Sequence, residues 1–178
     1  MDYLRTERES SFRREYVGGF WYGPHGEAAD EDGASAGHGL IKTNLLGTLY
    51  PTCRGLGFRL FSSQFKLHIA EKAAFYSPDV MGCLDAPEDD SYATSPCLLA
   101  EIVSERSEWT DRHAKYHAYT SIPSLQTYLI VEQDERRVYA YEREGGEWEL
   151  QELAGRGSVH ISCLGRTLSL DDIYAWVL

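Results

Sequence analysis

The chain has 178 residues, of which 43% are hydrophobic and 25% are charged, and its formal net charge is −11. This composition excludes a disordered segment and a membrane span, and the length predicts a single domain over residues 1–178. A negative field of this size repels phosphates, so the composition argues against a protein that coats DNA passively.

The first residues, MDYLRTERESSFRREY, lack the apolar core of a signal peptide, and no run of about 18 apolar residues follows anywhere in the chain. The sequence therefore predicts a cytoplasmic protein with no membrane partner. Its cysteines, Cys53, Cys83, Cys97 and Cys163, show no C-x-x-C spacing. We expect reduced, mostly buried thiols rather than a zinc ribbon or a redox pair.

The first part of the chain predicts a short hairpin, a loop and a helix. Aromatic residues around a Gly-Gly pair predict a strand or bent hairpin over 16–22. The segment 23–37 is rich in Gly, Ala and acidic residues, which is typical of a mobile surface loop. Apolar residues at helical spacing then predict an amphipathic helix from His38 to about Tyr50, ended by Pro51.

The middle of the chain changes to strand-like runs. Four of them, FRLFSS, QFKLHIA, YSPDVMGCLD and PCLLAEIVS, predict an antiparallel meander over 58–104. A second helix is expected from about Thr110 to Tyr119, with Thr110 as N-cap. Four further strand-like runs, LQTYLIVEQ, RRVYAYERE, EWELQEL and SVHISCL, and the capped segment SLDDIYAWVL complete the chain. We therefore expect an α/β (α+β) fold, with a mixed central sheet flanked by helices.

Two carboxylates occupy runs that are otherwise apolar on both faces. Asp79 precedes VMGCL and Glu101 lies within CLLAEIV, a pattern typical of central, covered strands. If Asp79 opposes Glu101 in an antiparallel pair, then Cys83 opposes Cys97 and both carboxylates share one face. Like charges so close are destabilising, so a proton or a divalent cation such as Mg²⁺ is expected between them. The alternative is that Asp79 points to solvent at a strand end.

Lys115 lies on the second predicted helix, beside an apolar stripe of Ala114, Ala118 and Ile122. Four positions after Asp111, it fits an ordinary surface ion pair. Beside two carboxylates and a cation, it fits another role, in which its ammonium orients a water and stabilises charge on a phosphoryl group. The spacing alone leaves both interpretations open.

These features together resemble a known family. The segments SPDV, LLAEIVSERSEWTDRHAKYHAYTSIPSLQTYLIVEQ and LSLDDIY are similar to the large bacterial Uma2 family of proposed restriction endonucleases, within the PD-(D/E)XK nuclease superfamily. The resemblance covers nearly the whole chain, from about Glu15 to the C-terminus. It implies a restriction-endonuclease-like core followed by additional C-terminal antiparallel strands.

The resemblance also implies a set of site residues. Asp79, Glu101 and Lys115 would be catalytic, with Mg²⁺ or Mn²⁺ held by the two carboxylates and the carbonyl of Ile102. In the superfamily motif the lysine follows the glutamate by two residues, where this chain has Val103, so the resemblance implies that it has moved to Lys115. Supporting roles are implied for Glu15, His38, Ser104, Asp111 and Tyr116. A structural ion pair for Glu15 and a capping or packing role for His38 are the alternatives.

Other groups of residues are weaker candidates. His113 and His117 have the i, i+4 spacing of zinc ligands, but Ala114 replaces the glutamate of H-E-x-x-H, so an exposed or capping pair is preferred. Aromatic residues of the C-terminal strands are expected to pack on the sheet rather than to stack on bases. These residues are Tyr139, Tyr141 and Trp148.

The function expected from these features is metal-dependent hydrolysis of phosphodiester bonds in DNA, with DNA as the substrate partner. The alternative is a non-catalytic nucleic-acid- or protein-binding module that retains the nuclease fold, which the net charge of −11 favours. The oligomeric state stays open, with a homodimer among the alternatives. The basic residues expected to form a local mouth for DNA are Arg13, Arg14, Lys42, Arg112 and Lys115.

Overall fold

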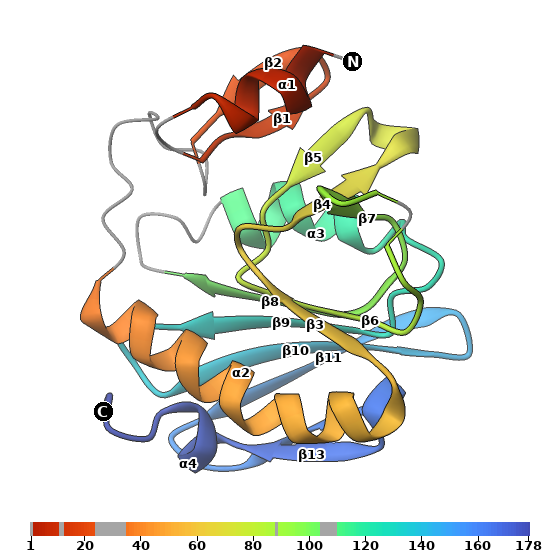
Figure 1. Cartoon of the computed structure of the whole chain (residues 1–178). Helices are drawn as coiled ribbons and strands as arrows, with labels where there is room; N and C mark the ends of the chain where they lie inside the picture. Colours follow the sequence, from red (N-terminus) through yellow and green to blue (C-terminus); the bar gives the residue numbers. More distant parts are fainter. Residues whose placement is uncertain (1, 11–12, 24–34, 88, 104–109) are drawn as a thin grey trace.

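A six-stranded mixed sheet forms the centre of the computed structural model, which describes residues 2–10, 13–23, 35–87, 89–103 and 110–178 (Figure 1). Its strand order is β11-β10-β9-β8-β6-β3. The strands are β3 (Arg59–Ser62), β6 (Val80–Cys83), β8 (Pro96–Val103), β9 (Thr127–Glu132), β10 (Arg137–Glu144) and β11 (Glu147–Ala154). The β8 and β9 strands run parallel and the other neighbours antiparallel, so the expected mixed sheet is confirmed.

A second sheet has the strand order β2-β1-β5-β4-β7. Its strands are β1 (Glu15–Val17), β2 (Phe20–Tyr22), β4 (Lys66–Ile69), β5 (Ala74–Tyr76) and β7 (Tyr92–Ala93), with α1 (Asp2–Arg8) beside β1 and β2 (Figure 1). The hairpin predicted over 16–22 is confirmed, and its turn uses the positive φ angles of Gly18 (56°) and Gly19 (102°).

The antiparallel meander predicted over 58–104 is wrong, because its strands divide between the two sheets. The β3, β6 and β8 strands pair in the central sheet, whereas β4 pairs with β5 in the second. A 3-10 turn (η2, Ala70–Lys72), followed by Ala73 in the left-handed region (φ 47°), folds β5 back onto β4. This local hairpin removes β4 from the central sheet.

Helices cover both faces of the central sheet (Figure 1). On one face lies α2 (Ala36–Leu56), with α4 (Leu170–Ile173), the 3-10 turn η4 (Ser162–Leu164) and the hairpin of β12 (Ser158–Ile161) and β13 (Arg166–Ser169). On the other face lie the π-helical turn η3 (Thr110–Lys115) and α3 (Tyr116–Tyr119). The α2-side core includes Ile41, Leu45, Leu49, Val80, Leu98, Ala100 and Ile102. The α3-side core includes Met81, Cys83, Leu99, Val103, Ala118, Tyr119 and Ile130.

Helix α2 is longer at both ends than the helix predicted from His38 to about Tyr50. It begins at Ala36, after Ser35, whose hydroxyl accepts from the His38 amide at 3.0 Å, and it continues through Pro51 to Leu56. The buried stripe of the helix runs on to Cys53, and the packing of that last buried position outweighs the backbone hydrogen bond lost at Pro51. The loop expected over 23–37 falls largely on 24–34, outside the described residues.

The pairing of β6 with β8 confirms half of the predicted register. Val80 opposes Ala100 and Gly82 opposes Leu98, as the alignment of Asp79 with Glu101 requires. The register then shifts, and Cys83 opposes Pro96. Cys97 is the extra residue of this β-bulge, which turns it into the α2-side core instead of the face of Cys83.

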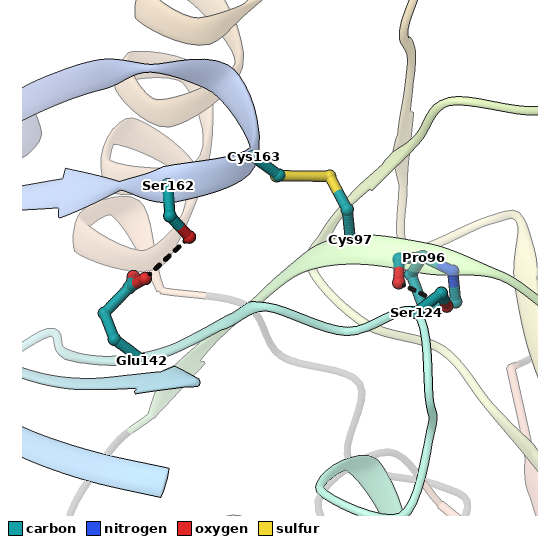
Figure 2. The surroundings of a disulfide bond; sticks show 6 residues. All are labelled: Pro96, Cys97, Ser124, Glu142, Ser162 and Cys163. Carbon is teal, nitrogen blue, oxygen red and sulfur yellow. Dashed lines mark hydrogen bonds between the residues drawn. A yellow bond between two sulfur atoms is a disulfide. The ribbon is translucent and has the colours of Figure 1, made fainter. Parts of the chain in front are cut away.

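The bulge explains why the expectation of four reduced thiols is wrong. Cys97 forms a disulfide with Cys163 of η4, with Cα atoms 6.3 Å apart (Figure 2). Around it, Ser124 donates to the carbonyl of Pro96 at 2.8 Å and Ser162 to Glu142 at 2.9 Å. Two cysteines, Cys53 and Cys83, are free and buried. Among the helices of the described residues, none is long and apolar enough to cross a membrane.

Candidate functional site

Asp79 lies in the bend just before β6 and is 2% exposed. Its Oδ1 atom lies 2.8 Å from Lys42 Nζ and 3.0 Å from His38 Nε2. Its Oδ2 atom accepts a hydrogen bond from the Ile102 amide at 3.0 Å. The alternative in which Asp79 points to solvent is therefore wrong.

The local structure explains these contacts. His38 and Lys42 lie one turn apart on the N-terminal half of α2, so both can reach the same carboxylate. The β6 strand begins only at Val80, and the Asp79 carboxylate binds the Ile102 amide just beyond the paired residues of β6 and β8. Asp79 thus contacts the backbone amide of Ile102. The role of the Ile102 carbonyl as a metal ligand stays a prediction.

Glu101 lies on β8 and is fully buried. Its Oε1 atom accepts from the Tyr119 hydroxyl at 2.7 Å and lies 3.2 Å from Lys115 Nζ. Lys115 is also fully buried, so its interpretation as a surface partner of Asp111 is wrong. The side chain of Asp111 and the whole of Ser104 lie outside the described part of the chain.

Glu15 brings the second sheet to the same lysine. Its Oε1 atom lies 3.2 Å from Lys115 Nζ and accepts from the Ser77 amide at 3.1 Å. The network continues through Lys66, which donates to the Ser77 hydroxyl and to Glu7, each at 2.8 Å. Glu15 therefore makes the structural ion pair expected as one alternative, and its partner is a predicted site residue.

Burial sets the electrostatics of these groups. It raises the pKa of Tyr119 well above its ordinary value, and the charge of Glu101 adds to this effect, so the phenol stays protonated and donates. Burial also raises the pKa of Tyr76, beside Glu15 and Lys115, to about 12. For Lys66, burial lowers the pKa, while the hydrogen bond to Glu7 opposes that shift.

The expectation that a proton or a cation must separate Asp79 from Glu101 needs correction. Each carboxylate has an ammonium of its own, Lys42 for Asp79 and Lys115 for Glu101. These ammonium groups come from helices on opposite faces of the central sheet, because α2 and the turn η3 flank it. The structure thus compensates both charges with lysines.

The oxygen donors nevertheless fit a hard cation. Mg²⁺ in proteins is commonly bound by one or two carboxylates and keeps several waters. The two buried carboxylates, Asp79 just before β6 and Glu101 on the neighbouring β8, supply the type of oxygen that it prefers. Within the described ranges, no three His, Cys, Asp or Glu residues gather in a metal-binding group. A metal here would depend on backbone carbonyl and water oxygens as well.

The second helix differs from the regular helix predicted over 110–119. Residues Thr110–Lys115 form a π-helical turn before α3 begins at Tyr116. Lys115, Ala118 and Tyr119 are buried at ordinary helical spacing, whereas Ala114 is exposed. The apolar stripe predicted through Ala114 is therefore wrong at that residue.

Several other predicted residues have packing or surface positions. The ring of Tyr116 packs on Tyr141, with centroids 4.8 Å apart. His113 and His117 are exposed, in agreement with the exposed or capping pair that the sequence favoured. Tyr139, Tyr141 and Trp148 pack against the α3-side core, which confirms their packing role.

The prediction of a basic mouth for DNA is wrong for three of its five residues. Lys115 is buried, Lys42 binds Asp79, and Arg14 pairs with Glu7 at 3.0 Å. The side chain of Arg112 lies outside the described part of the chain.

Two residues contact the candidate carboxylates although the sequence did not predict these contacts: Lys42, which was expected in the basic mouth for DNA, and Tyr119. The signal for Lys42 was its position one helical turn after His38, on a helix that the sequence did predict. The signal for Tyr119 was its position one turn after Lys115, which places its hydroxyl on the same carboxylate.

The family model described as "Putative restriction endonuclease", Uma2, matches residues 2–171. The chain belongs to the Uma2 family. Two proteins of Synechocystis are similar to it along most of their length. The uncharacterized protein sll1609 is 32% identical over 162 residues, which cover 88% of each chain. The uncharacterized protein slr1290 is 26% identical over 176 residues, which cover 97% of this chain and 89% of that protein.

A solved structure supports the fold of this Uma2 member. It is the crystal structure of "a putative nuclease belonging to DUF820" from Anabaena variabilis, which matches with a TM-score of 0.74 at 15% identity. The match covers 95% of this chain and 93% of the other. At this identity the similarity shows the shared fold, and the expected restriction-endonuclease-like architecture is confirmed.

Proposed function

We propose that this Uma2 protein is a divalent-metal-dependent endonuclease that hydrolyses phosphodiester bonds in DNA at Asp79, Glu101 and Lys115. One observation carries the proposal: a fully buried lysine lies 3.2 Å from each of two buried carboxylates, Glu15 and Glu101. Removing such ions from water costs about 3 kcal/mol or more per ion. A cluster of them is therefore better explained by function than by stability.

The proposal gives each of these residues a role. Asp79 and Glu101 would hold Mg²⁺ or Mn²⁺ with the Ile102 carbonyl, and the bound ion would acidify the attacking water and neutralise phosphoryl charge. Lys115 would orient that water and stabilise negative charge developing on the phosphoryl oxygens. Glu15 holds Lys115 in place.

Two further side chains would keep the carboxylates oriented. Tyr119 donates to Glu101 at 2.7 Å, and His38 lies 3.0 Å from Asp79. Oriented ligands lose less freedom when a cation binds, so both side chains would favour metal binding.

A second candidate is a DNA- or protein-binding module without catalysis. It is favoured by the direct contacts of Lys42 and Lys115 with the two carboxylates, because these compensate the buried charges without a metal. The net charge of −11 favours it too, since few basic residues remain to attract DNA.

The test is DNA cleavage with Mg²⁺, with Mn²⁺ and with a chelator, on supercoiled, linear and single-stranded DNA. We expect cleavage only with metal, and a loss of orders of magnitude for Glu101→Gln. Glu142→Gln is the matched control, because Glu142 is a half-buried carboxylate of the same sheet that contacts Ser162 instead of the candidate site. Metal-independent cleavage, or equal losses in both variants, would refute the proposed site.

Calorimetric titration of Mg²⁺ and Mn²⁺ separates the two candidates. The endonuclease binds the metal through Asp79, so Asp79→Asn loses the heat of binding. A protein that binds DNA, binds neither metal and cleaves no DNA would be the binding module instead.

A further inference from the structure

Three consecutive aromatic residues of β2 are exposed. Phe20 is 68% exposed, Trp21 52% and Tyr22 44%. The β2 strand is the outermost strand of the second sheet and pairs only with β1 among the described strands. Large aromatic side chains gathered on a surface mark a binding site more often than chance exposure does.

The strand register divides these rings between two faces of the hairpin. Tyr22 opposes Glu15 and Phe20 opposes Val17, and directly opposed residues in an antiparallel pair project to the same face. Glu15 contacts Lys115, and Val17 packs against the α3-side core. Phe20 and Tyr22 therefore lie on the face of the hairpin that also carries the contact with the candidate site.

Trp21 lies on the other face. It opposes Tyr16, whose ring stacks on Tyr3 of α1 with centroids 5.3 Å apart. The guanidinium of Arg14 covers the Trp21 ring at 4.6 Å. The same strand thus carries an aromatic pair on the face of the candidate site and one aromatic residue directed toward α1.

The charges of the protein disfavour a DNA duplex as the occupant of this surface. The basic side chains nearest the candidate site already contact carboxylates: Lys42 with Asp79, and Lys115 with Glu15 and Glu101. A duplex presents phosphates and hides the faces of its bases, so its binding depends on contacts with phosphates, which a net charge of −11 disfavours. An unpaired strand exposes base faces, which stack on aromatic rings whatever their sequence.

We propose that Phe20 and Tyr22 form a stacking surface for unpaired bases, and that the DNA taken by the site is single-stranded or locally unpaired. This inference rests on the proposed nuclease function, because it concerns the DNA strand whose phosphodiester bond enters the candidate site. The bases next to that phosphodiester stack on the hairpin, and the stacking supplies affinity that basic residues supply in other DNA-binding proteins.

The test is the binding of a short, labelled, single-stranded DNA oligonucleotide, measured by fluorescence anisotropy in chelator so that no cleavage occurs. The double variant Phe20→Ala, Tyr22→Ala should raise Kd about tenfold or more, as expected when stacked bases lose their rings. Trp21→Ala is the matched control from the other face of the same strand and should change Kd by about twofold or less. The same sequence as a duplex should bind more weakly than the single strand.

Three outcomes would overturn the inference: an unchanged Kd for the double variant, an equal loss for Trp21→Ala, or equal binding of duplex and single strand. A wild-type dimer that becomes monomeric in the double variant, with DNA binding unchanged, would make β2 an edge for self-association instead. Circular dichroism and Tm verify that the variants fold. If the protein binds single-stranded DNA selectively but shows no metal-dependent cleavage, only the proposed nuclease function is refuted. If the protein cleaves DNA and the double variant binds it as tightly as the wild type, only the stacking surface is refuted.

Discussion

The ammonium of Lys115 lies 3.2 Å from a carboxylate oxygen of Glu101, and neither side chain reaches solvent. This contact joins the π-helical turn to the central sheet, and Glu15 adds a second carboxylate from the other sheet, also at 3.2 Å. The buried Lys115 ammonium thus lies between two carboxylates from different sheets. Removing that cation should cost far more than removing a surface lysine, because buried charges depend on their partners.

Lys115→Met keeps the apolar stem and removes the ammonium from Glu15 and Glu101. We expect the free energy of unfolding at neutral pH to fall by about 3–5 kcal/mol, measured by urea denaturation. Lys72→Met, at an exposed lysine of η2, is the control and should change it by about 0.5 kcal/mol or less. Adding Glu101→Gln to Lys115→Met should restore part of the loss, and equal effects of the two lysine variants would contradict the prediction.

Lys42→Met should strengthen metal binding, because the Lys42 ammonium lies 2.8 Å from Asp79 and competes for the same negative charge. We expect Kd for Mn²⁺ to fall by about tenfold, measured by calorimetric titration. Lys66→Met is the control, since this buried lysine contacts Glu7 instead of Asp79. Weaker metal binding by Lys42→Met would show that Lys42 supports the metal site instead of competing with the metal.

Reduction should destabilise the protein through the bond between Cys97 and Cys163, which closes a loop with a sequence separation of 66. We expect dithiothreitol to lower the free energy of unfolding by about 2–4 kcal/mol, because the reduced unfolded chain gains conformational freedom. The variant Cys97→Ala, Cys163→Ala should be insensitive to dithiothreitol. Thiol titration of the denatured, unreduced protein should find only Cys53 and Cys83 reactive, and four reactive thiols would contradict the prediction.

His68 should make stability depend on pH in the acid range. Its ring stacks on Phe75 with centroids 4.2 Å apart, and burial lowers its pKa below the ordinary 6.5. The unfolded chain therefore binds the proton more readily, so stability falls as the pH drops from 6.5 through the lowered pKa. His68→Gln should flatten this part of the Tm profile, whereas His160→Gln, at an exposed position on β12, should not. A His68→Gln profile as steep as that of the wild type would argue against this role.

Local sequence patterns were enough to predict the fold class and to single out two buried carboxylates. The strand-like runs of the sequence predicted β8, β9, β10 and β11 correctly, because alternating or continuous apolar runs reflect local burial. The charged residues in apolar runs, Asp79 and Glu101, were recognisable because a carboxylate in a covered strand requires compensation. The aligned positions of Val80 and Ala100 followed from the same pairing.

The compensation of those charges and the pairing of the cysteines depend on contacts between segments far apart in the sequence. The bulge that turns Cys97 toward Cys163 changes the register by one residue, and no side-chain period predicts such a shift. Lys42 and Glu15 reach the site from a helix and a strand far from Asp79 and Glu101 in sequence. Sequence patterns report which residues are buried, whereas the choice of partner for each buried charge depends on how sheets and helices pack together.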